Sequence, residues 1–324
     1  MSGLKVMAIP GLTLPEINDL DLQRMHDAAG AGSEFIVSRY RDAVESAADV
    51  EVILGLVSPE LFAAAPNLKW VQSISSGVDA YMYPEFINSS VILTSEKGLV
   101  GEHLADHGFG LLLMLTRQLA RARDLGADSW NHRPELRREE MELTGLCMGI
   151  IGYGGTGRAM AKRAAAFGMA VRAVDRDLVP GDHVVAEAEP TSALGDLLAW
   201  SDVLVVCAPL TAETRGLLDA RAFGQLKEGA FLINVTRGEI MVEAALVEAL
   251  KSSRLRGAGL DVAPTEPLPE DSELWRLPNV VMTPHTAGAS QFRAARNMDR
   301  FVANLARFVK GEPLEGVIDK LLGY

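Results

Sequence analysis

The sequence predicts an α/β fold made of two doubly wound parallel-sheet domains. A chain of 324 residues is long for a single domain, since domains average roughly 150 residues. Short apolar runs rich in β-branched residues alternate with amphipathic helical segments from one end to the other. The runs are continuously apolar, as parallel strands covered by helices on both faces must be. This alternation is typical of βαβ units and therefore of parallel sheets.

The expected strands fall into two groups along the chain. The first group comprises 4–9, 50–56, 69–75 and 91–95. The second group comprises 147–152, 170–175, 203–208, 230–235, 257–262 and 280–283. Amphipathic helices are expected between the strands, the clearest at 156–168 and 241–253.

One segment interrupts the alternation of strand and helix. From Gly101 to about Asp128 the pattern is helical for longer than a crossover between two strands needs. A charged and aromatic stretch follows at 130–143, and a new strand begins at Cys147. We interpret the long helix as the junction between two domains and the polar stretch as an arm on the surface.

The composition argues against several classes of protein. Hydrophobic residues make up 48% of the chain, enough for a globular core, and the net charge of −12 disfavours binding to nucleic acid or to an anionic membrane. Cys147 and Cys207 lie in apolar runs and give neither a disulfide framework nor a zinc spacing, which fits a reducing compartment. There is no signal-peptide pattern, and the apolar stretch 110–116 is too short to span a bilayer. We therefore expect a soluble, cytoplasmic protein.

The most informative motif is a glycine-rich turn between a strand and a helix. Gly152, Gly154 and Gly157 form G-x-G-x-x-G directly after the strand 147–152. The first glycine permits a tight turn, the second lets the backbone approach a pyrophosphate, and the third lets the helix pack on the strand. Gly155 and Thr156 would present backbone N–H groups at the helix N-terminus, where an anion is favoured. The motif predicts a dinucleotide site.

The end of the next strand bears on which dinucleotide binds. Asp175 ends the strand 170–175, where a carboxylate can accept a hydrogen bond from the 2′-OH of the adenosine ribose. A 2′-phosphate would meet a like charge there, so NAD is favoured over NADP. The neighbouring Arg176 keeps NADP open, because a guanidinium could accommodate the phosphate.

Three side chains that could take part in a reaction follow predicted strands. Arg237 follows LINVT, Glu266 follows the strand that leads to Asp261, and His285 follows VVMTP. A 2-oxo or 2-hydroxy acid beside a nicotinamide needs a planar cation for its carboxylate and carbonyl, which suits arginine. It also needs a group that exchanges the hydroxyl proton, which suits histidine, and a carboxylate that orients the protonated imidazole.

Each of these residues also has an ordinary structural explanation. Taken singly, Arg237 would be a surface ion-pair residue, Glu266 a solvated charge and His285 a helix cap. Their convergence on one sheet edge beside a nucleotide motif favours the functional interpretation. His103 and His107 lie four residues apart on the long helix, but no third ligand accompanies them, so no metal site is predicted. The remaining histidines have no partner pattern: His26, His132 and His183.

Several segments match one known family in order along the chain. They are SISSGVDAY (73–81), SEKGLVGEHLADH (95–107), GYGGTG (152–157), CAPLTAETRGLL (207–218), INVTRGE (233–239), LDVAPTEPLP (260–269) and NVVMTPHTAG (279–288). On these motifs the chain resembles the D-isomer-specific 2-hydroxyacid dehydrogenases over nearly its full length. The resemblance implies a Rossmann-type NAD-binding domain at 99–290, inserted into a flavodoxin-like substrate domain formed by 1–98 and 291–324. Departures from the family pattern are Gly155 for a longer polar residue, Thr156 for an aliphatic residue, Asp106 for the usual Glu and Met241-Val242 for the usual Val-Asp.

The resemblance also assigns roles residue by residue. It makes Arg237 the substrate-carboxylate arginine, His285 the acid/base and Glu266 its partner. Residues implied in substrate binding, in addition to Arg237, are Ser76, Gly77 and Val78, through backbone N–H groups. Residues implied in cofactor binding, in addition to the glycine-rich turn and Asp175, are Ala208, Pro209, Val235, Thr236, Asp261 and Gly288, with Asp261 on the nicotinamide carboxamide. Family members are commonly dimers joined through the NAD domain, which makes 121–143 an expected interface.

The implied activity is reversible hydride transfer between NAD(H) and a small 2-oxo or D-2-hydroxy acid. The enzyme would be an oxidoreductase acting on CH–OH donors with NAD or NADP as acceptor, and glyoxylate or hydroxypyruvate are expected as substrates from their frequency in the family. Formate and phosphite dehydrogenases share the fold, but the formate type resembles this pattern with Gln in place of Glu266. A corepressor-like, NAD-sensing scaffold is the alternative outside enzymes, although no long tail for partner binding is seen.

Overall fold

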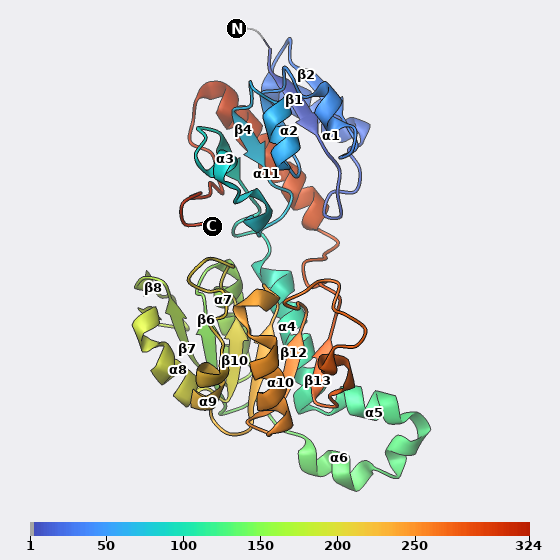
Figure 1. Ribbon diagram of the computed structural model, residues 1–324, viewed down its shortest axis with the longest axis vertical. Coiled ribbons are helices and arrows are strands. Elements are labelled where there is room, and N and C mark those ends of the chain that lie inside the picture. Colours follow the sequence, from blue (N-terminus) through green and yellow to red (C-terminus); the bar gives the residue numbers. More distant parts are fainter. Residues whose placement is uncertain (1–2) are drawn as a thin grey trace. The chain divides into compact units, whose positions relative to one another are not determined.

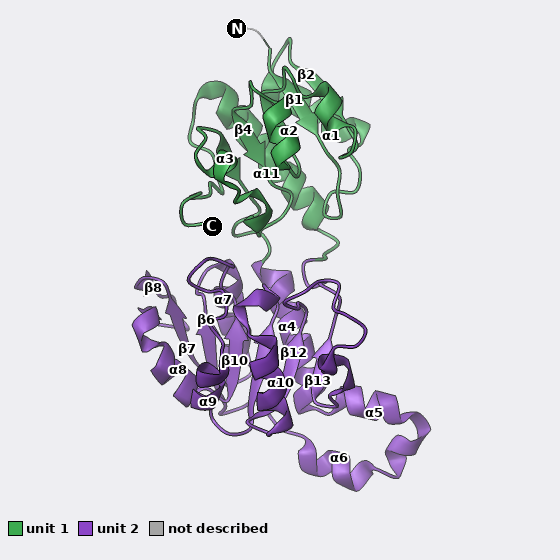
Figure 2. Cartoon of the chain, viewed as in Figure 1, with its two compact units in different colours: residues 1–100, 289–324 green, residues 101–288 purple. Residues whose placement is uncertain are grey.

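The computed structural model describes residues 3–324, which form two compact units (Figure 2). Unit 1 contains the described residues up to Val100 together with Ala289–Tyr324. Unit 2 contains Gly101–Gly288. Unit 1 is thus built from both ends of the chain, and unit 2 is inserted between them. The α/β fold class predicted from the sequence is confirmed in both units.

Unit 1 is organised around a five-stranded parallel sheet in the order β2-β1-β3-β4-β5. Its strands are β1 (Lys5–Ala8), β2 (Glu34–Val37), β3 (Val52–Leu54), β4 (Trp70–Gln72) and β5 (Ile92–Thr94). This is the flavodoxin-like strand order. The sequence did not predict β2. It is an edge strand with Glu34 and Val37 exposed, so it lacks the continuous apolar run of a strand covered on both faces.

Helices cover both faces of this sheet (Figure 1). On one face lie α1 (Asp19–Ala29) and α11 (Arg293–Lys310), and the ring of Phe301 in α11 stacks on Trp70 at 5.3 Å between centroids. On the other face lie α2 (Pro59–Ala64) and α3 (Pro84–Ile87), which bury Leu61 and Phe86. Two short 3₁₀ turns complete the unit, η1 (Ala43–Ser46) and η2 (Asp79–Tyr81).

A buried ion pair in unit 1 joins the two segments that lead to and from unit 2. Glu96, which follows β5, has a side chain only 1% exposed, and Arg293 begins α11. The Arg293 Nε lies 3.0 Å from Glu96 Oε2 and 3.2 Å from Oε1. The Glu96 N–H also donates to the Ser75 carbonyl, so the pair reaches the loop after β4.

Removing one partner of this pair is expected to destabilise unit 1 strongly. Arg293→Leu leaves the Glu96 carboxylate buried without its cation, which typically costs about 3–5 kcal/mol in the free energy of unfolding. Urea denaturation followed by circular dichroism measures the loss. The double variant Glu96→Leu/Arg293→Leu removes both charges and should recover much of it. If the double variant is no more stable than Arg293→Leu, desolvation of Glu96 is not the cause.

Unit 2 contains an eight-stranded sheet in the order β13-β12-β11-β10-β6-β7-β9-β8. Its strands are β6 (Cys147–Ile151), β7 (Ala170–Asp175), β8 (Val179–Pro180), β9 (Glu187–Pro190), β10 (Val203–Val206), β11 (Ala230–Asn234), β12 (Leu255–Leu260) and β13 (Val280–Met282). The strands are parallel except that β8 pairs with β9 antiparallel. From β9 through β7, β6, β10 and β11 to β12 the order is that of a Rossmann sheet. The strands β8 and β9 were not predicted, because they are short, lie toward one edge of the sheet and contain no continuous apolar run.

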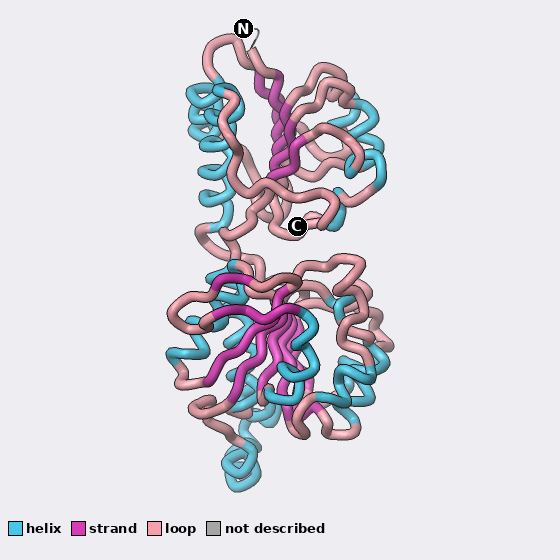
Figure 3. The backbone as a smooth tube through the Cα atoms, turned by 90° about the vertical axis from the view of Figure 1, so that its left-hand side faces the viewer, coloured by secondary structure: helices cyan, strands magenta, loops and turns pink. Residues whose placement is uncertain are grey.

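Helices lie on both sides of this sheet as well (Figure 3). On one face, α4 (Gly101–Thr116) packs against α7 (Gly155–Ala166). On the other face lie α8 (Leu194–Trp200), α9 (Ala220–Gln225) and α10 (Glu243–Lys251). The 3₁₀ turns that follow β9 along the chain are η4 (Thr191–Ala193), η5 (Gly238–Ile240) and η6 (Glu273–Arg276).

The prediction of one long helix from Gly101 to about Asp128 is wrong. The helix α4 ends at Thr116, and Gln118 adopts a left-handed conformation with φ of 54°. Three short helices follow, α5 (Leu119–Leu125), η3 (Gly126–Trp130) and α6 (Arg133–Glu139). Figure 1 shows α5 and α6 projecting from the body of unit 2, as expected of an arm. Within residues 3–324, no helix has both the length and the apolarity to cross a bilayer.

Candidate active site

The three candidate catalytic residues lie at one edge of the unit 2 sheet. The strands β11, β12 and β13 are parallel neighbours, so their carboxyl ends meet at the same edge. Arg237 follows β11, Glu266 follows β12 and His285 follows β13. A Cβ atom added to Gly238 would lie 2.0 Å from the Ala263 carbonyl carbon. The loop that carries Arg237 is therefore in direct backbone contact with the loop that leads to Glu266.

His285 and Glu266 form a hydrogen-bonded pair. The His285 Nδ1 lies 2.7 Å from Glu266 Oε2, and Glu266 Oε1 accepts a hydrogen bond from the Ala263 N–H at 3.0 Å. The side chains are 44% and 38% exposed, so the pair is open to solutes. Because Nδ1 is held by the carboxylate, Nε2 is the ring nitrogen that can exchange a proton with a substrate.

Arg237 is positioned by a buried asparagine at the end of β11. Asn234 is fully buried, and its Nδ2 donates to the Arg237 carbonyl at 2.9 Å. Its Oδ1 accepts from the Thr236 N–H at 3.0 Å. The Arg237 Nη1 donates to the Thr236 carbonyl at 2.8 Å, and the side chain is half-buried. The sequence analysis identified Arg237 but missed Asn234. The only sign of its role in the sequence is that it is a polar residue at the end of an otherwise apolar strand.

The turn that carries His285 is bound to Asp261. The His285 backbone has a positive φ of 54°, and its N–H donates to the Asp261 carbonyl at 2.8 Å. The Asp261 side chain is 1% exposed. One carboxylate oxygen accepts from Thr283 Oγ1 at 2.6 Å and from the Thr286 N–H at 2.8 Å, and the other accepts from the Ala287 N–H at 2.8 Å. Asp261 therefore holds the whole turn on which His285 sits.

The glycine-rich turn has the geometry that the sequence predicted for its glycines. Gly152 has φ of 92°, and a Cβ there would lie 2.6 Å from the Ala208 N. A Cβ on Gly157 would lie 2.1 Å from the Gly152 carbonyl oxygen. At Gly154, by contrast, a Cβ would meet nothing within 4 Å. The turn thus leaves open space at Gly154 over the N-terminus of α7, and these residues fit a dinucleotide pyrophosphate.

Gly154→Ala is expected to weaken cofactor binding while leaving the stability of the fold unchanged. The residue has φ of −80° and open space around it, so alanine fits the folded chain without strain. The added methyl group would occupy the space that a pyrophosphate needs, and NADH affinity should fall by at least about tenfold. Thermal unfolding and NADH titration by calorimetry check both halves. Gly110→Ala, at another open glycine within α4, is the control and should leave NADH affinity unchanged.

Asp175 ends β7, directly beside the glycine-rich turn. Its Oδ2 accepts from the Tyr153 N–H at 2.7 Å and its Oδ1 accepts from the Arg176 N–H at 2.7 Å. The Arg176 guanidinium bonds to Asp177 at 2.8 Å through Nε and 2.6 Å through Nη2. Asp177 therefore binds the Arg176 guanidinium, which is the cation that the sequence analysis named as a possible partner for a 2′-phosphate.

Tyr153, within the glycine-rich turn, belongs to a polar cluster that the sequence did not reveal. Its hydroxyl donates to Asp182 Oδ2 at 3.0 Å, and Arg158 lies over its ring at 4.6 Å and also contacts Asp182. Burial opposes ionisation of Asp182. The backbone N–H groups of Val184 and Val185, with the Tyr153 hydroxyl and Arg158, nevertheless lower the pKa of Asp182 to about 2. The turn is thereby tied to the β8–β9 segment.

The remaining predicted cofactor residues lie on the same sheet edge. Ala208 is buried against Gly152, and Pro209 accepts a hydrogen bond from Thr214 through its carbonyl. Val235 is buried directly after β11, and Gly288 is the last residue of unit 2. In the described residues, no group of three or more His, Cys, Asp or Glu is placed to hold a metal ion.

The predicted substrate loop lies in unit 1, at the carboxyl end of β4. It contains Ser76, Gly77 and Val78. The Ser75 Oγ donates to the Gly77 carbonyl at 2.8 Å, and Ser73 Oγ accepts from the Ser75 N–H at 3.1 Å. The loop conformation is therefore fixed by its own serine hydroxyls.

A family model assigns the chain. The model of the D-isomer specific 2-hydroxyacid dehydrogenase NAD binding domain matches residues 109–287. The chain belongs to the D-isomer specific 2-hydroxyacid dehydrogenase family. The family resemblance in the sequence motifs is thereby confirmed, and this dehydrogenase is an oxidoreductase with an NAD-binding domain in unit 2.

Individual relatives agree with the family. The glyoxylate reductase of Korarchaeum cryptofilum is 31% identical over 307 residues, covering 94% of this chain and 91% of the relative. The crystal structure of the NADPH-dependent glyoxylate/hydroxypyruvate reductase from Sinorhizobium meliloti, in complex with NADP and sulfate, superposes with a TM-score of 0.80 at 28% identity. That match covers 99% of this dehydrogenase and 100% of the solved chain.

A second solved relative is a D-isomer specific 2-hydroxyacid dehydrogenase family protein from Aeromonas salmonicida. It has a TM-score of 0.81 and 30% identity, covering 98% of this dehydrogenase and 100% of that chain. The agreement extends along the whole length and includes both units.

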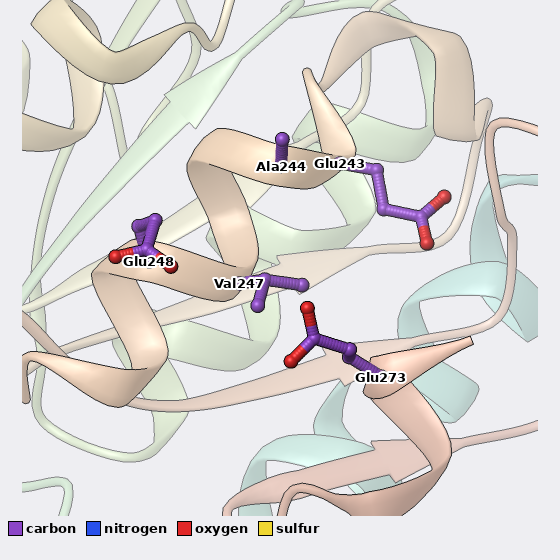
Figure 4. A pocket seen from close by; sticks show the side chains of 5 residues that line it. All are labelled: Glu243, Ala244, Val247, Glu248 and Glu273. Carbon is purple, nitrogen blue, oxygen red and sulfur yellow. The ribbon is translucent and has the colours of Figure 1, made fainter. Parts of the chain in front are cut away.

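A surface pocket elsewhere in this dehydrogenase is unsuited to an anionic substrate. It measures about 410 Å³ and lies between α10 and η6 (Figure 4). Figure 4 shows Glu273 facing α10, where Glu243 and Glu248 also line the pocket. Ser272 donates to Glu243, and Lys251 pairs with Glu273. A pocket lined by three carboxylates repels a 2-oxo acid, so this pocket is not a candidate for the substrate site.

Proposed function

We propose that this dehydrogenase reduces a small 2-oxo acid, glyoxylate or hydroxypyruvate, to the 2-hydroxy acid at the expense of NADH. The observation that carries the proposal is the His285–Glu266 pair, 2.7 Å apart, at the sheet edge that also holds Arg237 and the glycine-rich turn. The names of the relatives support the substrate class, since the Korarchaeum protein is a glyoxylate reductase and the Sinorhizobium protein is a glyoxylate/hydroxypyruvate reductase.

The chain's own residues supply binding, polarisation and a proton. The Arg237 guanidinium binds the substrate carboxylate and polarises the keto group in the planar geometry that arginine favours. The bound nicotinamide supplies the hydride. His285, protonated and oriented by Glu266, transfers the Nε2 proton to the keto oxygen as its negative charge develops. One hydride and one proton added to the carbonyl give the alcohol.

The loop of unit 1 and the dinucleotide site complete the proposed roles. Backbone N–H groups of Ser76, Gly77 and Val78 bind the substrate carboxylate. Asp175 accepts from the adenosine ribose, which favours NAD over NADP because a 2′-phosphate would meet its charge. The salt bridge of Arg176 to Asp177 supports this preference, since it occupies the nearby cation.

We also propose that the enzyme is a cytoplasmic homodimer joined through the arm of α5 and α6. Trp130 and Leu119 on the arm are 77% and 53% exposed, so the arm offers apolar surface to a second copy of the chain. The unpaired Cys147 and Cys207 support a reducing compartment. Light scattering should give twice the mass of the chain, and Trp130→Glu should give a monomer.

The test of the catalytic proposal is a substrate panel. NADH and NADPH oxidation is measured with 2-oxo acids from glyoxylate to branched and aromatic ones, and NAD⁺ reduction with formate and phosphite. Fast turnover of glyoxylate or hydroxypyruvate with NADH supports the proposal. Turnover of formate or phosphite alone, or NADH binding without any turnover, refutes it and favours a different reaction or a scaffold.

A further inference from the structure

A chain of hydrogen bonds links the buried Asp261 to α4. The His107 Nε2, on α4, lies 2.8 Å from Thr283 Oγ1, and Thr283 Oγ1 lies 2.6 Å from Asp261 Oδ1. The His107 Nε2 is also 3.5 Å from the same carboxylate oxygen. His107 is 24% exposed, whereas Asp261 is 1% exposed. His107 was considered only as a metal ligand in the sequence analysis. In the structure it is the outer member of a hydrogen-bond relay that leads to Asp261.

The donors and acceptors fix the direction of this relay. A hydroxyl has one hydrogen, and an ionised carboxylate only accepts. The Thr283 hydroxyl therefore donates to Asp261, and its oxygen accepts from His107. His107 must carry its hydrogen on Nε2, which both the cation and one neutral tautomer provide. The relay thus runs from the His107 N–H through the Thr283 O–H to Asp261 and supplies a hydrogen-bond donor to a carboxylate that is almost fully buried.

The environment of Asp261 gives this donor its importance. The carboxylate accepts from the Thr286 and Ala287 N–H groups, which belong to the two consecutive peptides that follow His285. Loss of the Thr283 donor would leave a buried carboxylate short of a hydrogen-bond partner, and such a group reorients toward other donors. The relay therefore holds the Asp261 carboxylate in one orientation.

We propose that His107 and Thr283 are positioning residues that hold Asp261 ready to accept the N–H of the nicotinamide carboxamide. This inference rests on the proposed function, in which Asp261 binds that amide, and it adds the residues that prepare the carboxylate. Neither His107 nor Thr283 is assigned a contact with the reacting atoms. Both act through Asp261, and the same carboxylate anchors the turn that bears His285.

The test compares two dinucleotides that differ only at the amide. NAD⁺ has a carboxamide N–H donor, and 3-acetylpyridine adenine dinucleotide has a methyl ketone in its place. His107→Leu and Thr283→Val are each expected to weaken NAD⁺ binding by about 3- to 10-fold in calorimetric titrations. Affinity for the acetylpyridine analogue should change by less than twofold, because it has no N–H for Asp261 to accept.

Conservative variants and a double variant separate positioning from general support of the fold. His107→Gln and Thr283→Ser retain a donor at each place and should bind NAD⁺ like the wild type. His107→Leu/Thr283→Val should weaken NAD⁺ binding no more than Thr283→Val alone, since both changes break one relay. Thermal unfolding measurements check that each variant is folded. If His107→Leu does not fold, the isosteric Thr283→Val variant alone is used for the titrations.

Three results would overturn the inference. These are equal losses for NAD⁺ and the analogue, additive losses in the double variant, and unchanged NAD⁺ affinity in Thr283→Val. The titrations contain no 2-oxo acid, so they report on the relay whether or not glyoxylate is a substrate. The variants could show the expected selective loss of NAD⁺ affinity while the wild type turns over no 2-oxo acid. That outcome would refute the proposed reaction but not the role of His107 and Thr283.

Discussion

His285→Gln is expected to lower kcat for 2-oxo acid reduction by about 10²–10⁴-fold, the range typical of a lost general acid. Glutamine can still hydrogen bond to Glu266, so the loop should keep its position. It cannot release a proton to the developing alkoxide, and hydride transfer would have to proceed without that neutralisation. Steady-state rates at saturating NADH measure the loss, and calorimetry should show NADH affinity within about twofold of the wild type.

A histidine outside the site provides the matched control. His26 lies on α1 in unit 1 and packs against Phe35 at 4.4 Å between ring centroids. His26→Gln should leave kcat unchanged, although it can lower the melting temperature slightly. Near-normal turnover by His285→Gln would remove His285 from the role of acid. A parallel loss of NADH binding would instead mean that the substitution disturbs the turn held by Asp261.

Arg237→Ala is expected to raise KM for the 2-oxo acid and to lower kcat, with kcat/KM falling by about 10³-fold or more. The guanidinium binds the carboxylate in the ground state and polarises the carbonyl in the transition state, so both parameters should change. Arg237→Lys retains the charge but not the planar pair of donors, and its activity should fall between those of Arg237→Ala and the wild type. Initial rates over a range of substrate concentrations separate KM from kcat.

The control for Arg237 is an exposed arginine of the same unit. Arg276→Ala, in η6, removes the same charge from unit 2 and should leave both parameters unchanged. An unchanged KM in Arg237→Ala would exclude Arg237 from the substrate site. Equal effects of the two variants would attribute the loss to net charge rather than to a specific contact.

The sequence predicts the inner strands well because burial on both faces imposes continuous apolar runs. It misses β2, β8 and β9, which lie toward sheet edges where no such run is required. The end of α4 was also missed, because the left-handed residue there is Gln118 and no glycine or proline marks the break. Edge strands and helix ends thus depend on tertiary contacts that a single sequence does not display.

The same distinction holds for the site. Arg237, Glu266 and His285 could be located because each follows a recognisable strand, and parallel strands end at one edge. Two features of the site could not be predicted, since they depend on loop conformation. They are the use of the His285 Nδ1 in the bond to Glu266 and the hydrogen bonds by which Asp261 holds the turn that carries His285. His107 joins Thr283 across 176 positions of sequence, and no local pattern reports a contact of that range.

The discontinuity of unit 1 has a consequence for synthesis on the ribosome. Trp70 stacks on Phe301, so the first-made sheet is completed by the last-made long helix. At 5–20 residues per second, the ribosome needs roughly 10–40 s to add the residues between the end of β5 and the start of α11. Throughout that interval the apolar face around Trp70 lacks its native cover, while unit 2 can fold in sequence order. The nascent chain therefore presents a defined, temporary binding surface for chaperones, and ribosome profiling with chaperone capture would detect it as occupancy that ends when α11 emerges.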